Sequence, residues 1–186
     1  EHTVQPGIVY ISFPTESGTL YSKQELTELY TVCQKHNIPL FIDGARLGYG
    51  LMAKKNDVTF EDIANLCDVF YIGGTKVGAL FGECIVILND LYKKDFRYSI
   101  KQHGGMLAKG RMLGIQFEEL FKDNRYLTIS KHAIDMADLL TEGFQSKGYR
   151  FYFPAETNQL FPIFENTKLE ELSKEFAFTP WAKVDE

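Results

Sequence analysis

The chain has 186 residues, of which 45% are hydrophobic and 24% are charged, and its formal net charge is -5. This length and balance are typical of a folded globular chain with one domain, or one domain and a piece of another. The acidic balance argues against a nucleic-acid partner, and no apolar run is long enough to cross a membrane.

The cysteines and histidines indicate the cellular compartment of the protein and whether it binds a metal. The three cysteines have no CxxC spacing, which favours buried thiols in a reducing cytoplasm. The four histidines are scattered without metal-ligand spacing, so we expect no metal site. The chain begins without Met, no signal peptide is visible, and strand-like runs lie close to both ends. We therefore expect a cytoplasmic protein, seen here as a piece of a longer one.

The first half of the chain alternates between short apolar runs and helical patterns. Ser22 and Glu25 have capping-box spacing and predict a helix that ends near His36, and Thr59 and Asp62 predict a second helix over 60–67. This alternation predicts parallel crossovers in an α/β fold. The last strand follows a short connection, so it is expected as an antiparallel neighbour or as a return strand. Short β-branched and aromatic runs predict strands at 8–13, 39–43, 68–74 and 84–88.

From Asn89 onward the pattern turns helical. Apolar residues at helical spacing predict long helices over 109–123 and 128–148. A β-β-α-β pattern then follows, with its helix at 168–175 and its strands at 149–153, 158–164 and 176–184. We therefore predict a boundary near residue 125, between a part of a large α/β domain (1–125) and a part of a small α+β domain (126–186).

Two charged residues stand at the ends of buried-looking strands. Asp43 ends the run PLFID, and Lys76 follows the run DVFYIGG among small residues. In an open parallel sheet the carboxyl ends of the strands border a crevice where ligands bind. Taken singly, Asp43 is an ordinary turn residue and Lys76 an ordinary solvated lysine. Together they predict an acid and an amine that face one ligand.

The chemistry of this pair favours pyridoxal phosphate (PLP). A lysine in a crowded apolar site has a lowered pKa and acts as a neutral nucleophile, whose natural electrophile is an aldehyde. A lone carboxylate can hold a protonated ring nitrogen. A lysine Schiff base and an acidic partner for the pyridinium nitrogen are the minimum that a PLP site requires. The glycines around Lys76 would let a flat ligand approach the backbone.

The segments FIDGAR and GGTKVGA resemble the threonine aldolase and aromatic amino acid β-eliminating lyase family, which has the aspartate-aminotransferase-like fold (PLP fold type I). VYISFPTESGTLYS and KQHGGMLAKGR resemble further family segments, so the resemblance covers essentially the whole chain. It implies that Lys76 binds the PLP aldehyde and that Asp43 binds the pyridine nitrogen. Arg46 would contact the ring hydroxyl or the substrate side, and Thr75 would lie near the phosphate.

The chain departs from this family at several positions. Phe13 stands where Asn is frequent, and His103 to Leu107 replace a G-G-G-M-R segment. The arginine that reaches a phosphate is absent from its usual place, and Lys109 or Arg111 is the candidate substitute. Family members extend beyond both ends of this chain, with a ring-stacking aromatic or His group, a phosphate loop and an arginine for the substrate carboxylate. The chain would then hold the lysine half of a site.

The resemblance implies a PLP-dependent lyase that cleaves a β-hydroxy amino acid to glycine and an aldehyde, in a homodimer or homotetramer. The alternatives are β-elimination on an aromatic or sulfur amino acid, transamination, and a non-catalytic module that keeps only the fold. The segment GGTK lacks the order of residues in a phosphate-loop NTPase. No G-x-G-x-x-G follows a strand and opens a helix, which argues against a nicotinamide-binding fold.

Overall fold

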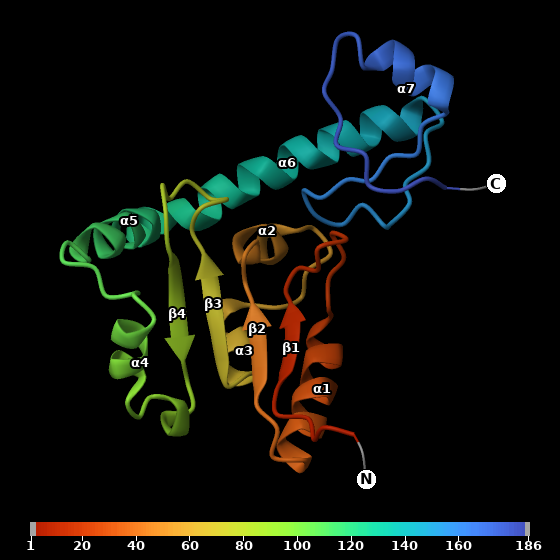
Figure 1. The fold of residues 1–186 in the computed structure, drawn as a ribbon. Coiled ribbons are helices and arrows are strands. Elements are labelled where there is room, and N and C mark those ends of the chain that lie inside the picture. Colours follow the sequence, from red (N-terminus) through yellow and green to blue (C-terminus); the bar gives the residue numbers. More distant parts are fainter. Residues whose placement is uncertain (1–2, 185–186) are drawn as a thin grey trace.

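The computed structural model describes residues 3–184. Its centre is a four-stranded sheet with the order β1-β2-β3-β4 (Figure 1). The first three strands run parallel, as predicted, and β4 is antiparallel to β3, which is one of the two arrangements expected. The strands agree with the predicted runs to within one residue at each end, and they comprise Val9–Ser12, Leu40–Asp43, Val69–Gly73 and Glu83–Ile87.

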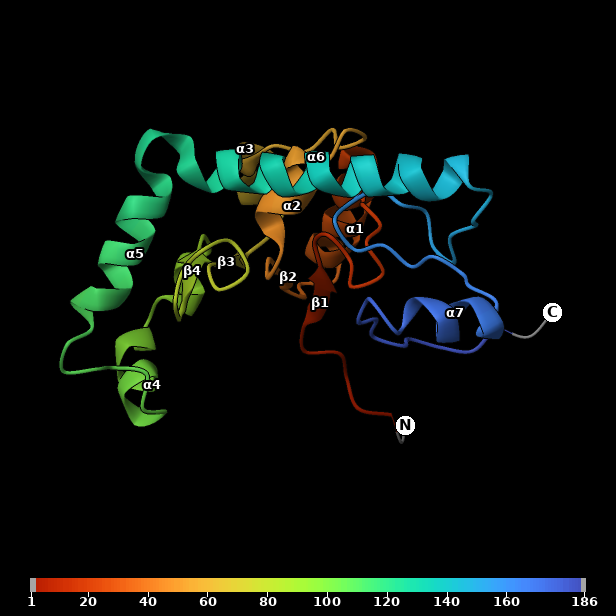
Figure 2. The same cartoon turned by 90° about the horizontal axis from the view of Figure 1, so that it is seen from above.

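Helices cover one face of this sheet. Figure 2 shows α1 (Lys23–Lys35) and α3 (Phe60–Asn65) on the same side of the strands. Alternate strand residues point toward these helices and are buried in the core, namely Leu40, Ile42, Phe70 and Ile72. The residues between them, including Phe41 and Asp43, face the opposite side, over which no helix of the described residues lies.

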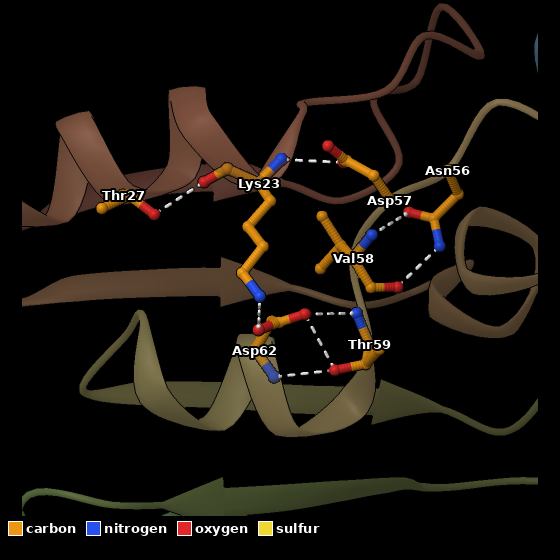
Figure 3. Close-up of polar contacts among 7 residues, drawn as sticks. All are labelled: Lys23, Thr27, Asn56, Asp57, Val58, Thr59 and Asp62. Atoms are coloured by element: carbon orange, nitrogen blue, oxygen red, sulfur yellow. Dashed lines mark hydrogen bonds and ion pairs between the residues drawn. The ribbon is translucent and has the colours of Figure 1, made fainter.

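The predicted capping box of α1 is present, and the residues predicted to open α3 form a second one. Ser22 and Glu25 cap α1, and Thr59 and Asp62 cap α3, each with reciprocal side-chain and backbone hydrogen bonds. The Lys23 ammonium lies 2.7 Å from Asp62 Oδ1 and joins the first turns of the two helices (Figure 3). These local signals fix where both crossover helices start, which explains why the sequence predicts this part well.

Helix α2 (Leu47–Met52) is the element that the sequence analysis missed beside the predicted site. It follows the β2 turn directly and packs under α6 (Arg125–Ser146), which runs past the ends of the strands (Figure 1). A Cβ added to Gly48 would lie 2.2 Å from Ser130 Oγ, so only glycine allows this approach of α2 to α6. The Gly48 amide also donates to the Tyr126 hydroxyl at 3.1 Å.

The segment after β4 forms an arm beside the sheet. It contains α4 (Phe96–Gln102), which lies in the stretch expected to be helical but was given no bounds, and α5 (Arg111–Phe121), which lies inside the predicted helix 109–123. Two 3-10 turns, Asp90–Tyr92 and Lys122–Asn124, join the arm to β4 and to α6. Figure 2 shows α4 and α5 next to β4, the far edge of the sheet from β1.

The C-terminal residues differ from the predicted β-β-α-β pattern. Among residues 149–184, which the structure describes, the only β-pairing is an isolated antiparallel bridge between Phe151 and Pro162, and 176–184 forms no strand. The helix predicted between the second and third of these strands is present as α7 (Asn166–Leu172). Proline has no amide hydrogen to donate, so Pro162 limits the pairing of these aromatic runs. Their rings pack against one another instead, as between Phe153 and Phe161, whose centroids lie 5.2 Å apart.

The predicted boundary near residue 125 coincides with the start of α6. The first half of this helix is nevertheless part of the main core, because Tyr126 and Ile134 are buried there. The division into 1–125 and 126–186 stays a prediction. None of the helices in residues 3–184 combines the length and the apolar character that crossing a membrane requires.

Cys33 and Cys67 are buried free thiols, as predicted, and Cys84 is half-buried. Burial raises the pKa of the Cys67 thiol to about 12. A thiol with this pKa is protonated at neutral pH and is a poor nucleophile. Cys67 therefore serves packing, and the chemistry of the chain must come from other groups.

Asp68 is a buried carboxylate that lies just before β3, away from the predicted site, and accepts hydrogen bonds from residues at the start of β2 and just after β4. It is 4% exposed, its Oδ2 accepts the Leu40 amide at 3.0 Å, and its Oδ1 accepts Asn89 Nδ2 at 2.9 Å. We expect Asp68→Ala to lower the free energy of unfolding by about 1–3 kcal/mol, because the buried Leu40 amide loses its acceptor. Asp68→Asn keeps one acceptor oxygen and should cost less. Urea unfolding measures both, and an Asp68→Ala midpoint equal to that of the wild type would contradict this role.

Candidate active site

The predicted acid and amine lie at the same edge of the sheet. Asp43 is the last residue of β2 and pairs in register with Ser12, the last residue of β1. β3 ends at Gly73, and Lys76 lies in the connection from β3 to β4. Figure 1 shows that the three parallel strands end on the same side, next to α2 and α6. The topology therefore brings both predicted residues to the carboxyl edge.

The Asp43 carboxylate accepts three hydrogen bonds. Its Oδ1 accepts the Ala45 amide at 2.9 Å and the Tyr71 hydroxyl. Its Oδ2 accepts the Tyr10 hydroxyl. Tyr10 comes from β1 and Tyr71 from β3, so each strand next to β2 supplies one phenol. The carboxylate is held in one orientation by donors on three sides.

These contacts decide the charge of Asp43. Partial burial acts to raise the pKa of its carboxyl, but the hydrogen bonds from Tyr10, Tyr71 and the Ala45 amide, with the charge of Lys76, outweigh it and leave the pKa below its ordinary value. Burial and the bond to Asp43 both raise the pKa of Tyr71, which keeps that phenol a donor. At neutral pH the site thus presents a fixed anion that can hold a cationic N–H group.

The backbone of the Lys76 loop is also fixed. The Tyr49 hydroxyl of α2 donates to the Lys76 carbonyl, and the Gly74 amide donates to Glu83 Oε2 at 2.8 Å. Val77 is 0% exposed and its amide donates to the Gly74 carbonyl at 2.9 Å. The Lys76 side chain itself is exposed. The crowded apolar surroundings that the sequence predicted for this lysine are not supplied by residues 3–184.

The glycines before Lys76 have a different use from the predicted one. A Cβ on Gly73 would lie 2.3 Å from the Ala45 carbonyl oxygen, and the Gly73 amide donates to the Gly44 carbonyl at 2.8 Å. The space beside Gly73 is therefore filled by the turn that follows Asp43, and not open to a flat ligand. This contact fixes the turn after β2 against the end of β3, and so relates Asp43 to the Lys76 loop.

Gly73→Ala is therefore expected to lower the free energy of unfolding by about 1–3 kcal/mol, since overpacking a tight contact displaces backbone. Gly114→Ala is the matched control: Gly114 lies within α5, and an added Cβ there meets nothing within 4 Å. That change should stabilise the chain by roughly 1 kcal/mol through helix propensity. Thermal unfolding of both variants compares them, and equal stability would show that the Gly73 contact is loose.

The other residues singled out in the sequence lie at several places in the fold, some beside Asp43 and Lys76 and some away from them. Arg46 is half-buried at the N-cap of α2, three residues after Asp43, and Thr75 is exposed next to Lys76. Lys109 and Arg111 are exposed at the start of α5, in the arm beyond β4. Phe13 is fully buried in the core, so its side chain serves packing and not ligand contact. Asp43, Arg46, Thr75 and Lys76 thus share one edge.

The sequence analysis missed the three tyrosines that hold the site. Tyr49 lies on a helix that was not predicted. Tyr10 and Tyr71 lie on predicted strands, and a signal for them was present: Tyr10 pairs with Phe41, two residues before Asp43 on the same face. Side chains at a spacing of two share a face of the sheet, so correct register alone would have put Tyr10 near Asp43.

The family model described as beta-eliminating lyase matches residues 1–167 of the chain. The chain belongs to the beta-eliminating lyase family. Among curated relatives, it is 32% identical over 175 residues to a low-specificity L-threonine aldolase from Pseudomonas sp. (strain NCIMB 10558). That match covers 92% of this chain and 50% of the relative, so the chain spans about half the length of the curated protein.

Solved structures agree with this family and with the predicted fold. A threonine aldolase from Leishmania major matches with a TM-score of 0.97 and 47% identity, covering 100% of this chain and 54% of that one. A valine-pyruvate aminotransferase from Salmonella typhimurium matches with a TM-score of 0.57 and 22% identity, over 78% of this chain and 39% of that one. This beta-eliminating lyase chain has the aminotransferase-like fold of PLP fold type I, with a mixed, mostly parallel sheet.

Proposed function

We propose that this protein is a PLP-dependent lyase that cleaves a β-hydroxy amino acid to glycine and an aldehyde, as a low-specificity threonine aldolase does. The observation that carries the proposal is the pairing of a fixed anionic carboxylate, Asp43, with an amine, Lys76, at one edge of the sheet. Identities of 32% and 47% to proteins named threonine aldolases support the reaction class. Because the chain spans about half of each relative, the activity is proposed for the whole protein.

The residues present fit the chemical demands of PLP. A pyridinium N–H needs an ionised acceptor, and Asp43 has a lowered pKa and is held by its neighbours. An aldehyde needs an accessible amine, and the Lys76 side chain is exposed on a loop whose backbone is fixed. We propose that Asp43 binds the ring nitrogen and that Lys76 Nζ is the point of attachment. Arg46 is proposed for the ring hydroxyl or the substrate side, and Thr75 for the phosphate.

When bound, PLP supplies an electron-withdrawing ring that stabilises negative charge at the substrate Cα. The residues of this chain determine how strongly that ring withdraws electrons, because they set its protonation and its position. Asp43, held ionised by the Tyr10 and Tyr71 hydroxyls, would keep a proton on the ring nitrogen. Tyr49 orients the Lys76 loop through the Lys76 carbonyl. Each group acts through a contact that a single substitution removes.

The product assay tests the proposal. The protein expressed from its native gene is incubated with PLP and L-threonine or L-allo-threonine, and glycine and acetaldehyde are quantified. The proposal expects glycine and acetaldehyde in equal amounts. Absence of both products from a protein that carries PLP would overturn it.

β-Elimination is the second candidate, favoured by the description of the matching family, beta-eliminating lyase, over residues 1–167. Its leaving group is on Cβ, so an aromatic or sulfur amino acid yields an α-keto acid and ammonia. Measuring pyruvate and ammonia with such substrates, next to glycine with threonine, separates the two reactions. For either reaction, we propose an amino acid as the small-molecule substrate, a cytoplasmic location and a homodimer or homotetramer.

A further inference from the structure

The carboxylate of Asp43 is held unsymmetrically. A carboxylate has two oxygens and about four lone pairs that can accept hydrogen bonds. Oδ1 already accepts two donors, the Ala45 amide and the Tyr71 hydroxyl, whereas Oδ2 accepts the Tyr10 hydroxyl alone. The free accepting position is therefore on Oδ2. A further donor, such as a ring N–H group, can be added there without displacing any contact.

The two phenols that donate to this carboxylate differ in how exposed and how rigidly held they are. Tyr71 is partly buried, and its hydroxyl shares Oδ1 with a backbone amide whose position the β2 turn fixes. Tyr10 is 56% exposed on β1, and its ring stacks on Phe41 with centroids 5.2 Å apart. Tyr71 with Ala45 is thus the rigid part of the clamp. Tyr10 is the accessible part and lies beside the free position.

We propose that Tyr10 and Tyr71 are positioning residues that act through Asp43: Tyr71 fixes Oδ1, and Tyr10 holds Oδ2 as the oxygen that accepts the cofactor's ring N–H. The role of the phenols toward Asp43 concerns this chain alone. Its consequence for the ring nitrogen rests on the proposed PLP function. Two phenols on one carboxylate also ensure that Asp43 meets the ring as an anion, because every neighbour donates to it.

The groups that face Asp43 can be named by element. Tyr10 comes from β1, Tyr71 from β3 and Lys76 from the β3–β4 connection, and all three favour the ionised carboxylate. The hydrogen bond to Asp43 is the main cause that raises the pKa of Tyr10, and burial is the main cause that raises the pKa of Tyr71. The charges of Glu16 and Glu83 add smaller effects in the same direction, on Tyr10 and Tyr71 respectively. With these groups in place, loss of either phenol should raise the pKa of Asp43 toward its ordinary value.

The first test needs no cofactor. The chain is labelled with ¹³C at aspartate side chains, Asp43 is assigned by its absence in Asp43→Asn, and its carboxyl signal is followed with pH in wild type, Tyr10→Phe and Tyr71→Phe. We expect the midpoint of Asp43 to rise in each phenylalanine variant. Tyr30→Phe, on α1, is the matched control and should leave it unchanged. Equal Asp43 midpoints in the wild type and both variants would overturn the inference.

Folding is controlled in the same samples. Phenylalanine keeps both rings, including the stack on Phe41, so the spectra of the variants should match the wild type away from the site. If Tyr71→Phe fails to fold, Tyr10→Phe alone decides, since Tyr10 is exposed and its ring is retained. An unchanged Asp43 midpoint in a folded Tyr10→Phe chain then contradicts the clamp.

The second test adds PLP to the protein expressed from its native gene and compares the PLP affinities of the wild type and the two variants by absorbance titration. Tyr71→Phe should bind PLP more weakly than Tyr10→Phe, because Oδ1 then keeps only the Ala45 amide and the carboxylate loses its orientation. Equal affinities, or a larger loss in Tyr10→Phe, would contradict the assignment of Tyr71 as the phenol that fixes the orientation of the carboxylate. If no variant binds PLP, and the wild type does not either, the proposed function fails. The cofactor-free titration still decides the role of the two phenols.

Discussion

Lys76→Ala should abolish lyase activity in the protein expressed from its native gene. The substitution removes the amine proposed to hold the aldehyde and any proton transfer at Nζ. Proton transfer alone accounts for about 10²–10⁴-fold in enzymes, so we expect the turnover of threonine to fall by at least that factor. Because the Lys76 side chain is exposed and its backbone is held by Tyr49, the variant should fold with unchanged stability. Glycine release under saturating PLP measures the effect.

Lys147→Ala is the matched control for this experiment. Lys147 is an exposed lysine at the C-cap of α6, away from the carboxyl edge of the sheet. Its replacement should leave activity and PLP binding at wild-type values. Retro-aldol activity retained in Lys76→Ala would remove Lys76 from the mechanism, while the fold and the family would stand.

Asp43→Asn should have the second largest effect and a different signature. An amide cannot become an anion, so the proton on the ring nitrogen loses its partner and the ring withdraws electrons less well. Removing one preorganised electrostatic partner typically costs about 10²–10³-fold in turnover. Lys76 is untouched, so the cofactor should still be attached to it. We therefore expect a PLP-loaded protein with strongly reduced turnover, measured by combining absorbance spectra with the glycine assay.

Asp90→Asn serves as the control, because Asp90 has a 91% exposed side chain paired with Lys93 far from the proposed site. It should leave turnover unchanged. If Asp43→Asn kept wild-type turnover, the carboxylate would not be the partner of the ring nitrogen. If both Asp43→Asn and Lys76→Ala were fully active, the carboxyl edge of this sheet would not be the active site.

The predicted parts of the fold are those with strong local signals. The capping residues Ser22 and Thr59 locate the starts of the crossover helices, and short apolar runs locate the strands to within one residue at each end. Helix α2 was missed because it has only six residues, two of them glycines, and is stabilised by its packing on α6. The C-terminal strands were wrongly predicted because aromatic runs resemble strands even where their rings pack as a cluster.

The site was predictable to the extent that topology determines it. Asp43 lies at the carboxyl end of one strand and Lys76 lies just after the carboxyl end of the next. Parallel strands have their carboxyl ends at the same edge of a sheet, so the shared position of the two residues can be derived from the order of elements alone. The hydrogen bonds of Tyr10 and Tyr71 depend on strand register, and that of Tyr49 depends on the packing of α2. The glycines beside Lys76 suggested room for a ligand, but Gly73 is required by the backbone at Ala45. Tertiary contacts of this kind have no local signature.

The covalent attachment of PLP is the central claim, and one experiment tests it directly. The protein expressed from its native gene is mixed with PLP, reduced with borohydride, digested and mapped by mass spectrometry. We expect a single pyridoxyl adduct on Lys76 in the wild-type protein, and no adduct at that position in Lys76→Ala protein treated in the same way. Adducts spread over the other lysines, with Lys76 unmodified, would contradict it.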